Sequence, residues 1–150
     1  MPQKVFYFAY GSNMDQDRLR GRIGSFHSRK RATLNGYNLV FNKRDSSYPG
    51  SGFANIVRGE GRVEGILYEI DETSLKRLDY YEGFPAHYNR IEVEVECEGK
   101  PLKAWAYVAN ENKVEEGLKP KREYLNHLLK GRDLLSEEYI EELQAVETID

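Results

Sequence analysis

Short runs of β-branched and aromatic residues, interrupted by glycine and polar turns, dominate the first two-thirds of the chain. The first run, 5–10, ends at Gly11 and predicts a strand. A short helical stretch is predicted next, over about 15–20, with Asn13 or Asp15 as its N-cap. The domain therefore begins with a strand, a glycine-containing loop and a helix.

Asn35-Gly36 lies between two further apolar runs, 31–34 and 37–41. An Asn-Gly pair between such runs is typical of a two-residue β-hairpin, so we expect two antiparallel strands joined here. The segment 45–52, rich in serine and glycine, is expected to form a surface loop or a flap near whatever the sheet binds. Additional strands are predicted at 53–57 and 62–70, joined through Gly59-Glu60-Gly61, and at 88–98 and 102–108.

The C-terminal part of the chain changes to helical spacing. Apolar residues at 124, 125, 128 and 129 precede Gly131, and Ser136 opens a second helix. Short strands joined mostly by tight turns, with a few inserted helices, indicate an α+β domain built on a mixed, curled or barrel-like sheet. A length of 150 residues fits one domain, 1–150.

Charge and composition narrow the class of partner. The chain has 22 Lys and Arg against 25 Asp and Glu, a formal charge of −3, with the two signs mixed along its length. This distribution does not indicate a polyanion, so we expect no nucleic-acid partner. The densest basic run, Arg29-Lys30-Arg31, is interpreted as a solvated strand edge.

Cysteine and histidine usage argues against disulfide or metal chemistry. Cys97 is the single cysteine, and its place in an alternating strand predicts an ordinary buried thiol in a reducing compartment. The histidines at 27, 87 and 127 stand in none of the usual ligand spacings, so no metal site is expected. The apolar run 5–10 is too short for a signal-peptide core or a membrane span. We therefore expect a cytoplasmic protein with no membrane partner.

The turn Tyr10-Gly11-Ser12-Asn13 is the first candidate functional element. A glycine and two small polar residues at a helix start leave consecutive backbone N–H groups free, where the helix dipole favours negative charge. Such a turn can hold an anion. From these four residues alone, a plain Asn-capped helix start after a strand is the favoured interpretation, and other observations must decide between the two.

The second candidate is Glu82, which follows a predicted helix over 71–81 with Asp71 as N-cap. Leu75 and Leu78 define the apolar stripe of this helix, and position 82 falls within the same angular window. Burial and the negative end of the helix dipole would both raise the pKa of this carboxyl, as a general acid/base requires. The alternative is a helix that frays at Tyr81 and leaves the carboxylate in solvent.

Several motifs of the chain resemble those of one known family, the γ-glutamylcyclotransferase-like proteins. The segment 8–14, Phe-Ala-Tyr-Gly-Ser-Asn-Met, is similar to the opening signature of that family. The matching pieces that follow in the family's order are 53–56, 63–70, 78–83 and 88–90, so the likeness covers residues 5 to about 108. These four ordered pieces, together with the opening signature, extend over some two-thirds of the chain and favour a shared family over chance.

The resemblance implies a small mixed β-barrel flanked by helices, with the site between the first-strand loop and the helix that ends in Glu82. It also implies that the turn Tyr10-Gly11-Ser12-Asn13 binds a γ-glutamyl group through backbone N–H groups, that Glu82 is the acid/base, and that Tyr88 lines the pocket. Because Tyr88 is out of phase with Val93, Val95 and the cysteine after them, we expect a bulge or bend to turn it toward the cavity.

The implied activity is γ-glutamyl cyclotransfer, in which the substrate's α-amine attacks its own side-chain carbonyl and expels the amine or amino acid, so that the glutamyl group becomes 5-oxoproline. This reaction needs no enzyme nucleophile, metal or organic cofactor, because intramolecular attack can supply effective molarities of about 10⁵ to 10⁸ M. The expected partner is a small γ-glutamyl compound, and a homodimer is left open. Two alternatives are a non-enzymatic module that binds γ-glutamyl or other amino-acid ligands, and an amide hydrolase that acts through water. The residues named do not select the leaving group.

Overall fold

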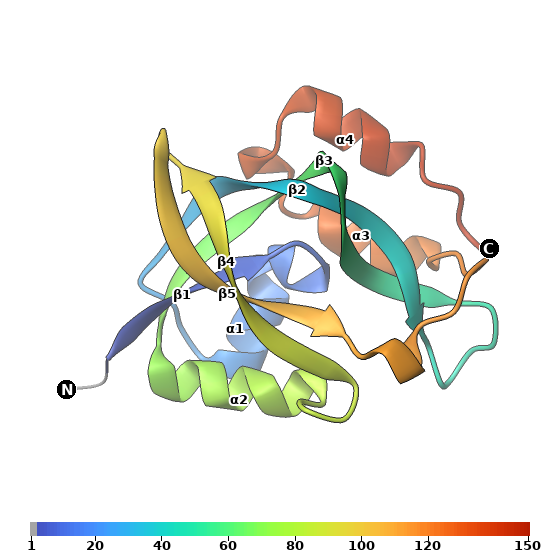
Figure 1. Cartoon of the computed structure of the whole chain (residues 1–150), viewed down its shortest axis with the longest axis horizontal. Helices are drawn as coiled ribbons and strands as arrows, with labels where there is room; N and C mark the ends of the chain where they lie inside the picture. The colour runs from blue at the N-terminus through green and yellow to red at the C-terminus, as the bar shows by residue number, and fades with distance from the viewer. Residues whose placement is uncertain (1–2) are drawn as a thin grey trace.

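The computed structural model of the chain describes residues 3–150 and shows a closed five-stranded β-barrel with helices packed around it (Figure 1). Neighbouring strands follow the order β1-β3-β2-β4-β5, and β1 closes the barrel by pairing in parallel with β5. The α+β fold with a small mixed barrel is therefore confirmed.

The strands are β1 (Lys4–Ala9), β2 (Ser28–Arg44), β3 (Gly52–Asp71), β4 (Tyr88–Cys97) and β5 (Lys100–Ala109). The helices are α1 (Gln16–Ile23), α2 (Glu72–Glu82), α3 (Arg122–Leu129) and α4 (Glu137–Gln144), with short 3-10 turns η1 (Ser12–Met14), η2 (Glu111–Lys113) and η3 (Arg132–Leu134).

The hairpin expected at Asn35-Gly36 is wrong, because β2 runs straight through this pair. Its antiparallel register against β3 passes from Asn35↔Arg62 to Tyr37↔Arg58, so Gly36 lies in a bulge, with φ +82°. A glycine at positive φ suits a bulge as well as a turn, and the dipeptide alone does not distinguish them. The segment 59–61, expected to link two strands, is likewise an irregularity inside the single strand β3. The N–H of Gly61 donates to the side chain of Asn38 at this point.

Two apolar cores lie on the two faces of the sheet. The inner core fills the barrel and includes Phe8, Ile56 and Val95, whereas the outer core lies between barrel and helices and includes Tyr7 and Leu78. Successive residues of a strand point to opposite faces, so neighbours such as 7 and 8 belong to different cores. Figure 1 shows α2 along one side of the barrel, with α3 and α4 toward another.

The basic run in β2 does not form a strand edge, because a closed barrel has none. Its side chains instead contact acidic and backbone groups from distant segments. Arg29 Nη1 donates to Asp133 Oδ2 at 2.7 Å and Lys30 Nζ donates to Glu98 at 2.7 Å, while the side chain of residue 31 donates to a carbonyl of the η3 turn. The run therefore helps to hold the C-terminal segment and the β4–β5 turn against the barrel.

The predicted helices are present, with one difference in capping. The carboxylate of Asp15 accepts hydrogen bonds from the first backbone N–H groups of α1, and Ser136 caps α4 through the N–H of Tyr139. Asp71 occupies the N-cap position of α2, but its carboxylate pairs with His27 Nε2 at 2.7 Å instead of capping the helix. The thiol of residue 97 is buried, as expected. None of the helices in residues 3–150 has the length and apolar character of a membrane span.

Candidate active site

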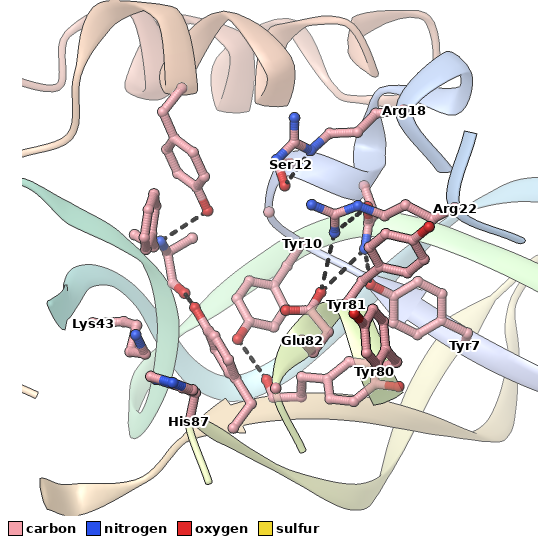
Figure 2. A pocket seen from close by; sticks show the side chains of 18 residues that line it. Tyr7, Tyr10, Ser12, Arg18, Arg22, Lys43, Tyr80, Tyr81, Glu82 and His87 are labelled. Atoms are coloured by element: carbon pink, nitrogen blue, oxygen red, sulfur yellow. Dashed lines mark hydrogen bonds and ion pairs between the residues drawn. The ribbon is translucent and has the colours of Figure 1, made fainter. Parts of the chain in front are cut away.

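A cavity of about 310 Å³ lies between the loop after β1 and the C-terminal end of α2 (Figure 2). This volume falls at the lower end of the range for small-molecule sites, about 300–1,000 Å³. All six residues predicted for the site line it, namely Tyr10, Gly11, Ser12, Asn13, Glu82 and Tyr88. The remaining lining residues are Tyr7, Arg18, Arg22, Lys43, Phe53, Ala54, Tyr80, Tyr81, Gly83, His87, Tyr107 and Tyr124.

Glu82 is the last residue of α2, and the helix does not fray before it. Gly83 ends the helix in the left-handed conformation, with φ +68°, and its N–H donates to the carbonyls of Asp79 and Tyr80. Leu75 and Leu78 are fully buried on the stripe that packs against the barrel. The glutamate side chain follows this stripe into the cavity and is only 18% exposed. The interpretation of a solvated carboxylate is therefore wrong.

Asn13 positions the carboxylate of Glu82. Its amide Nδ2 lies 3.2 Å from Glu82 Oε1 and 3.0 Å from the hydroxyl oxygen of Tyr7. Arg22 Nη1 donates to Asn13 Oδ1 at 3.2 Å and lies 3.9 Å from Glu82 Oε1. Asn13 itself is 2% exposed. Its side chain thus has a role that the sequence did not indicate, beside the predicted role of its backbone N–H.

Burial raises the pKa of Glu82 above its ordinary value. The positive charges of Arg22, Arg18 and Lys43 and the hydrogen bond from Asn13 act in the opposite direction, but burial has the larger effect. A carboxyl group with a raised pKa exchanges protons more readily near neutral pH than an exposed one does. Glu82 is therefore a buried carboxyl in the cavity with a raised proton affinity, as the predicted acid/base requires.

The loop between β1 and α1 lines the cavity with Gly11, Ser12 and Asn13. Met14 N–H is the first to bond back within the η1 turn, to Gly11 O at 3.0 Å, so the preceding N–H groups have no acceptor within the turn. Tyr68 fixes the loop from behind by donating its hydroxyl to Asn13 O at 2.8 Å. Arg18 Nε donates to Ser12 Oγ at 3.1 Å, which adds a cation at the same end of the cavity. This arrangement suits a carboxylate or a developing oxyanion.

Tyr88 reaches the cavity without the predicted bulge. Its register with β5 is regular from Tyr88↔Ala109 to Cys97↔Lys100. Tyr88 lies on the outer face of the barrel, in the same core as Tyr107, whereas Val93 faces the barrel interior. A bulge was expected on the assumption that the site lies on the same face of the strand as Val93. None is needed, because the cavity lies on the outer face, where Tyr88 already points. The hydroxyl of Tyr88 donates to Ala54 O at 3.2 Å.

The sequence did not indicate several of the lining residues. Arg18 and Arg22 are four positions apart on α1, so the sequence shows that they share a helix face. No local pattern indicates that this face lies beside Glu82 in the cavity. Tyr124 comes from α3 and accepts the backbone N–H of Ala54 at 3.0 Å, which gives the C-terminal helices a part in the site. In residues 3–150, no three His, Cys, Asp or Glu side chains are grouped as a metal site would require.

Known proteins share sequence similarity and the fold with this chain. The family model described as gamma-glutamyl cyclotransferase, AIG2-like, matches residues 7–126. Human gamma-glutamylcyclotransferase is 31% identical to the chain over an alignment of 157 positions, which covers 99% of this chain and 81% of the human protein. A solved structure described as gamma-glutamyl cyclotransferase superposes with a TM-score of 0.87 at 28% identity, covering 99% of this chain and 90% of that one.

A bacterial relative extends the similarity to a longer protein. YkqA of Bacillus subtilis is 32% identical over 148 residues, which cover 93% of this chain and 51% of YkqA. Its crystal structure superposes with a TM-score of 0.85 at 28% identity. The chain therefore spans about half the length of this relative.

Proposed function

Because the chain belongs to the gamma-glutamyl cyclotransferase, AIG2-like family, we propose that it is an enzyme that cyclises γ-glutamyl amides to 5-oxoproline and releases the amine. Family membership confirms the resemblance that the motifs indicated. The observation that carries the proposal is the Asn13–Glu82 contact inside a cavity that the neighbouring loop residues Gly11 and Ser12 also line. A protein that only binds a ligand has no need of a buried carboxyl group whose charged form is destabilised, as the raised pKa of Glu82 indicates.

In this mechanism the ionised carboxylate of Glu82 takes a proton from the substrate's α-ammonium group. The neutral amine then attacks the side-chain carbonyl carbon, forming the new C–N bond and a tetrahedral oxyanion. The N–H groups of the loop at 11–13 stabilise the charge that develops, as preorganised donors do in acyl transfer. Binding energy is used to fold the glutamyl chain so that the amine faces the carbonyl.

Collapse of the intermediate breaks the bond to the leaving nitrogen. Two protons leave the α-ammonium in the whole reaction, and both end on the leaving amine, which departs as an ammonium ion. Glu82 relays these protons, acting first as base and then as acid. Tyr7 and Asn13 keep the carboxylate aimed at the reacting nitrogens through this exchange.

The test is incubation of the protein with a panel of γ-glutamyl amino acids, peptides and amines, followed by mass spectrometry of the products. We expect 5-oxoproline and the free amine in equal amounts from at least one compound. Free glutamate in place of 5-oxoproline would identify an amide hydrolase. A compound that binds in calorimetry but is recovered unchanged would identify a binding module and overturn the proposal.

A further inference from the structure

Lys43 is a buried cation that the mechanism above does not use. It lies near the C-terminal end of β2, lines the cavity and is only 6% exposed. Its Nζ donates to the carbonyl of Arg44 at 2.9 Å, which uses one of the three hydrogens of the ammonium group. Among residues 3–150, no carboxylate forms an ion pair with it.

The other neighbours of this ammonium group compensate its charge only in part. The rings of Phe53 and Tyr88 have their centroids 5.8 and 5.7 Å from Lys43 Nζ, near the outer limit of a cation–π contact. Burial, together with the positive charges of Lys113 and Arg44, lowers the pKa of Lys43. Buried charges are normally paired, so this place favours an anionic ligand that would complete the set of partners.

Lys43 and the arginines occupy different ends of the cavity. Figure 2 shows Glu82 between Arg18 and Arg22 on one side and Lys43 with His87 on the other. Arg22 has a larger effect on the pKa of Glu82 than Lys43 does, which agrees with this order. The site therefore has two cationic ends with the acid/base between them.

We propose that Lys43 binds a carboxylate of the leaving group, so that the enzyme prefers γ-glutamyl amino acids or peptides over γ-glutamyl derivatives of plain amines. This inference rests on the function proposed above. The carboxylate of the glutamyl half is assigned to the opposite end, where Arg18, Arg22 and the loop N–H groups lie. Because Glu82 delivers a proton to the leaving nitrogen, the group on that nitrogen extends away from the ring that is closing, toward Lys43.

The experiment compares two substrates that differ only in charge on the leaving side, γ-glutamyl-alanine and γ-glutamyl-alanine amide. Each is assayed for 5-oxoproline release by the wild type and by Lys43→Met, which keeps length and apolar bulk but removes the ammonium. Lys113→Met is the matched control, since it removes a nearby positive charge that does not line the cavity. Melting curves of the three proteins accompany the kinetics.

We expect the wild type to favour the carboxylate substrate in kcat/KM by about tenfold to a hundredfold, the usual worth of one charge-assisted hydrogen bond. The ratio should fall to near one in Lys43→Met, through loss on the carboxylate substrate alone, and should persist in Lys113→Met. If Lys43→Met does not fold, inhibition of the wild type decides the question, because alanine should then inhibit at least tenfold more strongly than alanine amide.

Three results would overturn the assignment of Lys43. These are equal rates for the two substrates in the wild type, a preference that survives in Lys43→Met, and an equal loss on both substrates in that variant, which would place Lys43 on the glutamyl half. Each of them still includes 5-oxoproline formation. A complete absence of 5-oxoproline from both substrates and from the wider panel would instead overturn the proposed function.

Discussion

The amide of Asn13 donates a hydrogen bond of 3.2 Å to Glu82 Oε1, and this contact joins the two elements of the site, which are 69 positions apart in the sequence. A donor to a carboxylate stabilises its charged form and lowers its pKa. Asn13 therefore offsets part of the effect of burial on Glu82. It also holds the carboxylate in place, because its other contacts, to Tyr7 and Arg22, fix the amide itself.

Replacing Asn13 by Ala should move the pH dependence of the enzyme. Loss of the donor raises the pKa of Glu82 further, so the base form is lost at a higher pH and the acidic limb of the kcat/KM profile shifts upward. A profile of initial rates from pH 5 to 9 measures the shift. A merely structural role for Asn13 would lower the melting temperature and the rate but leave the limb where it is in the wild type.

Replacing Glu82 by Gln should leave a folded protein that turns over at least about a hundredfold more slowly, since general acid/base catalysis contributes roughly 10² to 10⁴. The amide fits the same space but does not accept and return a proton. Single-turnover release of 5-oxoproline, with circular dichroism to establish the fold, gives the comparison. Near-normal turnover by the folded variant would remove Glu82 from the mechanism.

The same substitution should change stability in a direction set by pH. The pKa of Glu82 is raised in the folded state, so ionisation of this group costs stability as pH rises through the folded pKa, and that cost is absent below the unfolded value near pH 4. We therefore expect Glu82→Gln to melt above the wild type at pH 8, with the difference vanishing toward pH 4. A variant that melts below the wild type at pH 8 would show that the ionised carboxylate stabilises the fold.

The sequence predicted the two halves of the site because each half depends on local signals. Gly83 and the stripe of Leu75 and Leu78 mark where α2 ends and which face carries Glu82, and the loop after β1 is marked by Gly11. The same kind of local signal failed at Gly36, where a positive φ serves a bulge in a long strand. Short patterns thus define the conformation of a residue better than the pairing of its strand.

The remaining site residues could not be predicted, because the tertiary fold brings them together from elements far apart in the sequence. Lys43 lies on β2 and Tyr124 on α3, and neither has a neighbour in sequence that indicates a cavity. Tyr88 shows the same limit, since the strand pattern gave its parity correctly but not the face on which the site lies. Topology, more than local pattern, decides which side of a strand becomes functional.

The last prediction concerns the loop and separates a binding role for Gly11 from a purely structural one. A Cβ placed there would lie 3.2 Å from the hydroxyl of Tyr124 and 3.5 Å from Ala54 Cβ, and valine would extend further into the same space. The φ of −114° lies outside the left-handed region that favours glycine, so the main effect of the added side chain is to fill the cavity side of the turn. We therefore expect Gly11→Val to fold but to lose binding of 5-oxoproline. Gly21→Ala is the matched control, because a Cβ on that glycine of α1 meets nothing within 4 Å. Calorimetric titration beside melting curves makes the comparison, and normal binding of 5-oxoproline by a folded Gly11→Val protein would show that the ligand does not approach this turn.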